Sequence, residues 1–195
     1  MNKVFKRIKE WWYLYLVALI LLPIGVSYLT YMINLPRNEE TISIFIASCG
    51  SDVKKLREAL EKEKPQYLRQ ISIKSYVYSD HDFSTYYNYF GCQDVDIVVL
   101  PESKISSDVV LSNYKKLETD LDSGATYYYP EGASSPYGKR IHKQGEENGL
   151  ITYKDETHDE DYYLFYGKDS LHLGAMSDTK WDTALIFAKI IEGEQ

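Results

Sequence analysis

Residues 41–47 read TISIFIA and residues 95–100 read VDIVVL, two short runs rich in β-branched residues. Runs of this length and composition, bounded by turn-forming residues, are typical of buried strands. Between them, Ile71 to Tyr78 alternates apolar and polar residues, which indicates another strand. These three predicted strands decide the fold.

The segments that join the strands have helical spacing. Residues 52–64 carry apolar side chains three or four positions apart, with Ser51 as the predicted N-cap. Residues 83–90 are rich in aromatic side chains and are followed by Gly91, which suits a helix C-terminus. Strand, helix, strand, helix and strand in some 60 residues predict a parallel βαβαβ unit.

The second half of the chain is less regular. Residues 123–140 are rich in Gly, Ser, Pro and Tyr and indicate a long loop. Short strands are predicted at Lys139 to Lys143, Gly149 to Tyr153 and Tyr162 to Tyr166, and an amphipathic helix from Trp181 to Ile191 with Asp178 as its cap. The predicted fold class is α/β, with one three-layer domain around a mainly parallel sheet.

A membrane anchor is predicted before this domain. Residues 11–35 contain no charged side chain, and at ~1.5 Å per residue they reach about 37 Å, enough to cross a hydrocarbon core. Aromatic residues of the kind that anchor membrane helices, Tyr and Trp, lie near the ends of the run. Four basic residues precede the run in positions 1–10, which is the side expected to face the cytosol. The prediction is a cytoplasmic flank at 1–10, a single-pass anchor at 11–35 and an extracytoplasmic domain at 36–195.

Two other interpretations of the N-terminus stay open. Gly25 and Ser27 could mark the exit of a cleaved signal peptide, although the apolar run continues to Leu35. Residues 46–49 read IASC and resemble a bacterial lipobox, but polar residues separate them from the apolar core. The uncleaved anchor accounts best for the length of the run.

Charge excludes some classes of partner. The whole chain carries −7, and from Trp11 onward 18 basic residues stand against 28 acidic ones, a net charge of −10. An acidic domain without a basic stripe is a poor nucleic-acid binder, and anionic lipid repels it, so the apolar span must supply the membrane attachment.

The two cysteines do not suggest a disulfide. Cys49 follows the first strand and Cys92 precedes the third, which places them at opposite edges of a parallel sheet. Strands of five or six residues separate those edges by about 17–20 Å, whereas a disulfide needs Cα atoms within about 7 Å. Two unpaired, partly buried thiols are expected.

Motifs for catalysis, metals and cofactors are weak. His81, between two aspartates, is the best catalytic candidate, but a helix-capping turn accounts for it more simply. Residues 155–166 begin like a calcium loop and lack its glycine and its final glutamate. Gly50 and Gly91 are isolated, so no phosphate loop appears. No catalytic residue, metal or cofactor is predicted.

A ligand site is expected where parallel strands end, because the loops that follow them meet at one edge of the sheet. The predicted contacts are Ser48, Ser51, Ser79 and Glu102, together with Tyr128 from the tyrosine cluster at 127–129. That cluster has two open interpretations, an exposed contact surface and core packing.

Three stretches resemble the first lobe of the extracytoplasmic solute-binding proteins of ABC transporters, especially those for sugars and oligosaccharides. They are the opening strand and helix at 41–63, the step at 83–100 in which Gly91 precedes Val95-Asp96-Ile97-Val98, and the segment at 162–191. The resemblance implies a single lobe of that family. The 160 residues from Pro36 onward leave no room for a second lobe, so closure of two lobes around a ligand is not expected.

Three functions follow, in order of preference. The first is a non-enzymatic module that serves an ABC transporter permease or another envelope protein. The second is direct binding of a small solute, a sugar or a peptide, in a half-cleft. The third is an envelope enzyme of unknown reaction.

Overall fold

The computed structural model describes residues 2–50, 52–117, 124–173 and 182–193, with side chains from Trp11 onward except Tyr15. The chain divides into two compact units, one up to Arg37 and one from Asn38. The predicted ligand contact Ser51 and the predicted helix residues Asp178 and Trp181 lie outside the described part.

The first unit consists of the helix α1, Asn2–Asn34, which continues through Pro23. Its segment Trp11–Asn34 is long and apolar enough to cross a membrane, and the side chains described there are exposed. The predicted anchor and this candidate span differ at one position, since Leu35 lies just beyond the helix.

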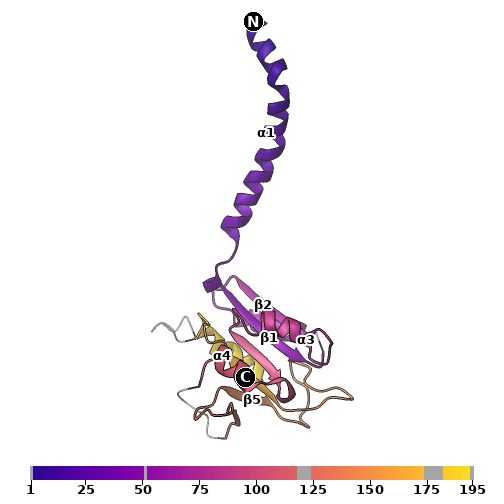
Figure 1. Ribbon diagram of the computed structural model, residues 1–195, viewed down its shortest axis with the longest axis vertical. Helices are drawn as coiled ribbons and strands as arrows, with labels where there is room; N and C mark the ends of the chain where they lie inside the picture. Colours follow the sequence, from indigo (N-terminus) through magenta and orange to yellow (C-terminus); the bar gives the residue numbers. More distant parts are fainter. Residues whose placement is uncertain (1, 51, 118–123, 174–181, 194–195) are drawn as a thin grey trace. The chain divides into compact units, whose positions relative to one another are not determined.

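The second unit is a mixed α/β domain (Figure 1). Its elements are η1 (Asn38–Glu40), β1 (Thr41–Ser48), α2 (Lys54–Lys62), β2 (Gln70–Val77), α3 (Phe83–Phe90), β3 (Ile97–Pro101), η2 (Glu102–Lys104), α4 (Ser107–Asn113), β4 (Tyr127–Tyr128), β5 (Gly138–His142), β6 (Tyr162–Tyr166) and α5 (Thr183–Glu192).

The six strands form one sheet in the order β2-β1-β3-β6-β5-β4. Strand β1 pairs in parallel with both β2 and β3, which confirms the predicted βαβαβ unit. Strands β6, β5 and β4 then add antiparallel pairs. The sheet is therefore mixed, and only its first three strands follow the predicted parallel arrangement.

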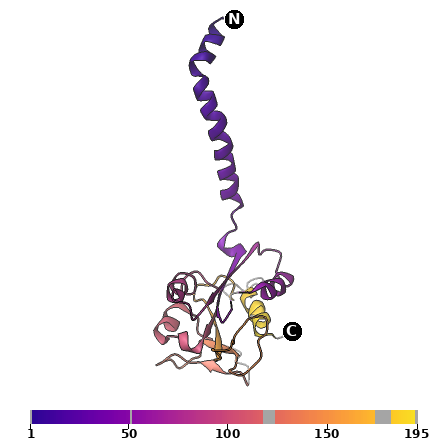
Figure 2. The ribbon, with the colours of Figure 1, turned by 90° about the vertical axis from the view of Figure 1, so that its right-hand side faces the viewer.

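Helices cover both faces of the sheet. Figure 2 shows α2 and α5 on one side and α3 and α4 on the other. All five residues of β3 and of β6 are buried, as expected for central strands covered on both faces. Helix α2 buries Leu56 and Leu60, two of the three apolar positions of the predicted helix. The third, Val53, is half-buried and is the N-cap in place of the predicted Ser51, because the helix begins at Lys54.

Two local predictions in the second half are wrong. Residues 149–153 are not a strand, because the Asn148 side chain accepts hydrogen bonds from the Tyr153 and Lys154 N–H groups and holds the chain in a turn. The predicted loop at 123–140 contains the two-residue strand β4. Strand β4 forms because Tyr127 and Tyr128 pair with the first residues of β5.

Both cysteines are free and partly buried, as predicted. The parallel pairing of β1 with β3 places Cys49 after the end of one strand and Cys92 before the beginning of the other. Burial raises the pKa of each thiol above its usual value of 9.0. Neither thiol is therefore poised as a thiolate nucleophile.

Candidate functional site

The residues predicted as ligand contacts do not gather in one place. Ser48 is fully buried, and its hydroxyl donates to the Gly50 carbonyl. Ser79 and Glu102 are exposed. Tyr128 lies in β4 at the far end of the sheet, with its ring against Tyr163 and Phe165. None of these four residues lines either of the two cavities described below.

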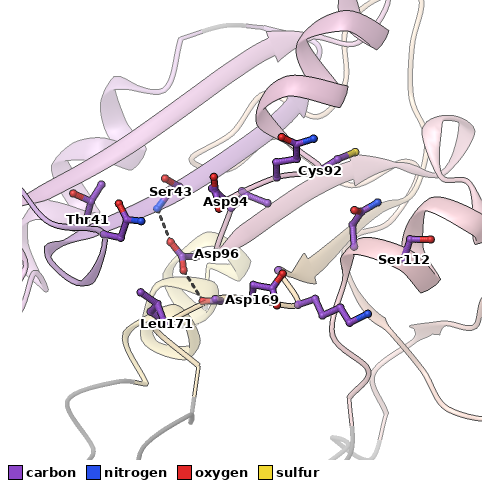
Figure 3. Close-up of a pocket in the computed structure, with 15 residues that line it drawn as sticks. Thr41, Ser43, Cys92, Asp94, Asp96, Ser112, Asp169 and Leu171 are labelled. Carbon is purple, nitrogen blue, oxygen red and sulfur yellow. Dashed lines mark hydrogen bonds between the residues drawn. The ribbon is translucent and has the colours of Figure 1, made fainter.

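A cavity of about 540 Å³ lies at the opposite edge of the parallel strands. It is lined by the start of β1, by the segment before β3 and by the segment after β6 (Figure 3). Its lining is mostly polar and contains the hydroxyls of Thr41, Ser43, Ser112 and Ser170, the amides of Asn38, Gln93 and Asn113, the carboxyls of Asp94, Asp96 and Asp169, and the ammonium of Lys168. We call this space the polar cavity.

The antiparallel direction of β6 creates the polar cavity. Strand β6 ends at Tyr166, beside Ile97 at the start of β3. The residues after β6 therefore meet those before β3, although some 75 positions separate them in the sequence. Gly167 makes this approach possible, because a Cβ there would lie 1.7 Å from the Val95 carbonyl oxygen.

Asp96 is the central buried charge of the polar cavity. Its residue is only 6% exposed. One carboxyl oxygen accepts from the Ser43 N–H at 2.7 Å, and the other accepts from the Ser170 hydroxyl at 2.5 Å (Figure 3). Burial raises the pKa of Asp96, while the two hydrogen bonds and nearby His172 act against that rise.

Ser170, His172 and Asp96 do not form a nucleophile and base. The Ser170 hydroxyl donates to Asp96, so it is not hydrogen-bonded to an imidazole that could take its proton. The His172 ring instead lies with Nε2 3.0 Å from the Thr41 carbonyl oxygen, to which it donates. This arrangement holds the cavity wall together and positions Asp96.

Asp94 stands at the rim of the polar cavity in an unusual backbone conformation. Its φ of 48° is the one positive φ among the described residues other than glycine. Aspartate tolerates this left-handed region better than most residues. The turn exposes the Asp94 side chain at the cavity, and the chain continues through Val95 and Asp96 into β3, which begins at Ile97.

The edge at which a ligand was predicted is filled with aromatic side chains instead. Cys49 lies 3.6 Å from the Tyr162 hydroxyl, and the Tyr162 ring contacts those of Tyr78, Tyr153 and His142. Tyr78 and Tyr153 are each 4% exposed. These contacts make the carboxyl ends of the parallel strands part of the core.

In the acidic turn at 155–161 the Asp155 carboxylate binds backbone N–H groups of the same turn, and His81 faces solvent in the turn before α3. Asp155 accepts hydrogen bonds from the Thr157 and His158 N–H groups, which lower its pKa to about 2. Within the described part of the chain, no group of three or more acidic, His or Cys side chains could hold a metal ion.

Comparison with known proteins found no relative. No protein-family model, no curated protein and no solved structure matches this chain. Any function must therefore be argued from the site itself.

A sequence signal for the polar cavity did exist. Asp96 is an acidic residue inside the apolar run at 95–100, where burial of a charged side chain is unfavourable unless partners compensate it. The polar residues of 167–170, directly after a strand of aromatic residues, are a second sign. Only the antiparallel pairing of β6 shows that the two belong together.

Proposed function

We propose that this protein is a non-enzymatic, membrane-anchored module that binds a small polar solute in the polar cavity. The helix α1 would hold the domain on the extracytoplasmic side of the membrane. The observation that carries the proposal is Asp96, a buried carboxylate that faces a cavity of about 540 Å³ and is held in place by two donors. A volume of about 300–1,000 Å³ is typical of small-molecule sites, and the polar cavity falls within this range.

The likeness to one lobe of a solute-binding protein is part of the proposal. In its favour stand the parallel β2-β1-β3 core and the helices on both faces of the sheet. The polar cavity lies at the other edge of the parallel strands from the predicted cleft. The proposed module therefore binds its solute away from the edge that the resemblance implies.

The test uses the full chain in lipid nanodiscs and calorimetric titration with a panel of sugars, polyols, amino acids and short peptides. Ser170→Ala removes a donor to Asp96 and should weaken binding at least about tenfold. Ser79→Ala is the matched control at the opposite edge and should leave the Kd unchanged. Loss of binding in Ser79→Ala alone, or no binding by any member of the panel, would contradict the proposal.

A second candidate role is service to a transporter permease or another envelope protein. Exposed tyrosines favour it, since Tyr89 of α3 is 71% exposed and Tyr86 is 39% exposed. Tyrosine is enriched at protein interfaces. A photo-crosslinking residue at position 89 should capture a membrane protein in intact cells, whereas the same residue at Glu58, on α2, should not.

The side of the membrane is tested separately. A protease added to intact cells should remove a tag from the C-terminus and leave a tag at the N-terminus untouched. The opposite pattern would place the domain in the cytosol.

A further inference from the structure

A second cavity of about 240 Å³ adjoins the polar cavity. The two share four lining residues, Ser43, Gln93, Asp94 and Val95. Beyond this shared wall the second cavity is lined by side chains of a different kind, which include Lys74, Tyr89 and Phe90. We call it the aromatic cavity.

Carboxyl groups predominate in the polar cavity, whereas the aromatic cavity adds an ammonium beside the shared Asp94. Asp94, Asp96 and Asp169 outnumber Lys168 in the polar cavity, and Lys74 lines the aromatic cavity. In the described part of the chain, none of these five side chains forms an ion pair with another residue. A ligand with complementary charges can therefore pair with them without breaking an existing ion pair.

The position of Lys74 is fixed by an aromatic ring. Its ammonium lies 3.3 Å from the centroid of the Phe90 ring, in a cation–π contact. An ammonium has three N–H donors, and a ring face leaves donors available for an anion. Phe90 itself is held by the Tyr76 ring, which is parallel to it within 1° at 6.1 Å. The cation is thus supported from the strand β2 and the helix α3.

We propose that the two cavities together bind one small zwitterion, a free amino acid or a short peptide. Its ammonium group lies against Asp94 and Asp96, and its carboxylate points toward Lys74. An apolar or aromatic side chain of the ligand contacts Tyr89 and Phe90. This inference rests on the proposed solute-binding function and names the class of solute.

Other classes of solute match the charges less well. A neutral polyol leaves the aspartates and Lys74 without a charged partner. A dianion meets the three carboxyls of the polar cavity, and a polyamine meets Lys74. Only a ligand with one positive and one negative end pairs with both sides of the shared wall.

Chemically blocked ligands test the inference on the unchanged protein. The full chain in nanodiscs is titrated with glycyl-phenylalanine, its N-acetyl form, its C-terminal amide and free phenylalanine. We expect each blocked form to bind at least about tenfold more weakly than the free dipeptide. The ratio of the Kd values of the dipeptide and free phenylalanine shows whether the site prefers a peptide or a free amino acid.

Two variants then test which protein residue binds each charged end of the ligand. Asp94→Asn should reduce the difference between the free and the N-acetylated dipeptide, since Asp96 still faces the ammonium, and Lys74→Met should remove the difference between the free dipeptide and its amide. Asp80→Asn, in an exposed turn at the opposite edge, is the matched control and should change neither ratio. Thermal unfolding of each variant checks that it is folded.

The outcomes separate the two proposals. If a neutral sugar or polyol binds and Ser170→Ala weakens that binding, while the dipeptide and phenylalanine do not bind, the zwitterion is wrong and the solute-binding function stands. If blocked and free dipeptides bind equally, the zwitterion is also wrong. If no compound of the panel binds, both the solute-binding function and the zwitterion as its ligand are wrong.

Discussion

Gly167 is the residue at which a single methyl group should disrupt both the fold and the site. In Gly167→Ala the new Cβ would lie 1.7 Å from the Val95 carbonyl oxygen and 2.9 Å from its carbon. Both atoms belong to the backbone and cannot rotate away, so the two segments must separate by more than an ångström. That shift stretches the hydrogen bond from the Gly167 N–H to the Asp96 carbonyl, now 3.0 Å.

The size of the effect follows from these two contributions. Forced overpacking costs about 1–3 kcal/mol, and a lost buried hydrogen bond about 1 kcal/mol. We expect the free energy of unfolding to fall by about 3 kcal/mol, and Tm by about 6–12 °C for a domain of this size. Solute binding should weaken too, because Ser170 follows Gly167 closely and positions Asp96.

Near-UV circular dichroism of the full chain is the suitable measurement. It follows the packed tyrosines of the domain, whereas the far-UV signal also contains the helix α1. Gly149→Ala is the matched control, since a Cβ there meets nothing within 4 Å. Its Tm should stay within about a degree of the parent or rise slightly. If Gly167→Ala unfolds at the same temperature as Gly149→Ala, the close approach of Gly167 to Val95 is wrong.

Three further predictions concern stability and the thiols. Lys139→Met removes the ammonium that lies 2.7 Å from the carboxylate of Glu192, a side chain that is only 8% exposed. The free energy of urea unfolding should fall by about 2 kcal/mol, because the buried carboxylate loses this charged partner. An unchanged midpoint of urea unfolding would contradict this prediction. Burial lowers the pKa of His142 below its usual 6.5, so on acidification the His142 imidazole takes up a proton more readily in the unfolded chain than in the folded chain. Stability should fall as the pH drops below 6.5, and His142→Phe should show a smaller fall in the same urea titrations; equal slopes would exclude the role of His142. Alkylation under non-reducing, denaturing conditions should add two groups by mass spectrometry, at Cys49 and Cys92, whereas an unmodified pair would indicate a disulfide.

The sequence by itself determined the features that depend on neighbouring residues. An uncharged run of apolar residues is recognisable as a candidate membrane span without knowledge of any contact, and the apolar segment Trp11–Asn34 of α1 matches the predicted span to within one residue. The runs at 41–47 and 95–100 form buried strands, and the helices between them follow from apolar spacing. Each connection between the first three strands is short and contains one helix. Such connections favour parallel pairing of the strands that they join.

Only the tertiary structure decided where the candidate site lies. An alternating or apolar run predicts a strand but not its direction, because side chains point to alternate faces in parallel and antiparallel strands alike. The antiparallel direction of β6 brings Ser170 to Asp96 and builds the polar cavity at the edge where β1 and β3 begin. Had β6 run parallel, the same residues would lie at opposite edges of the sheet. Strand order likewise separates Tyr128 in β4 from Ser79 after β2, because these strands form the two outer edges of the sheet.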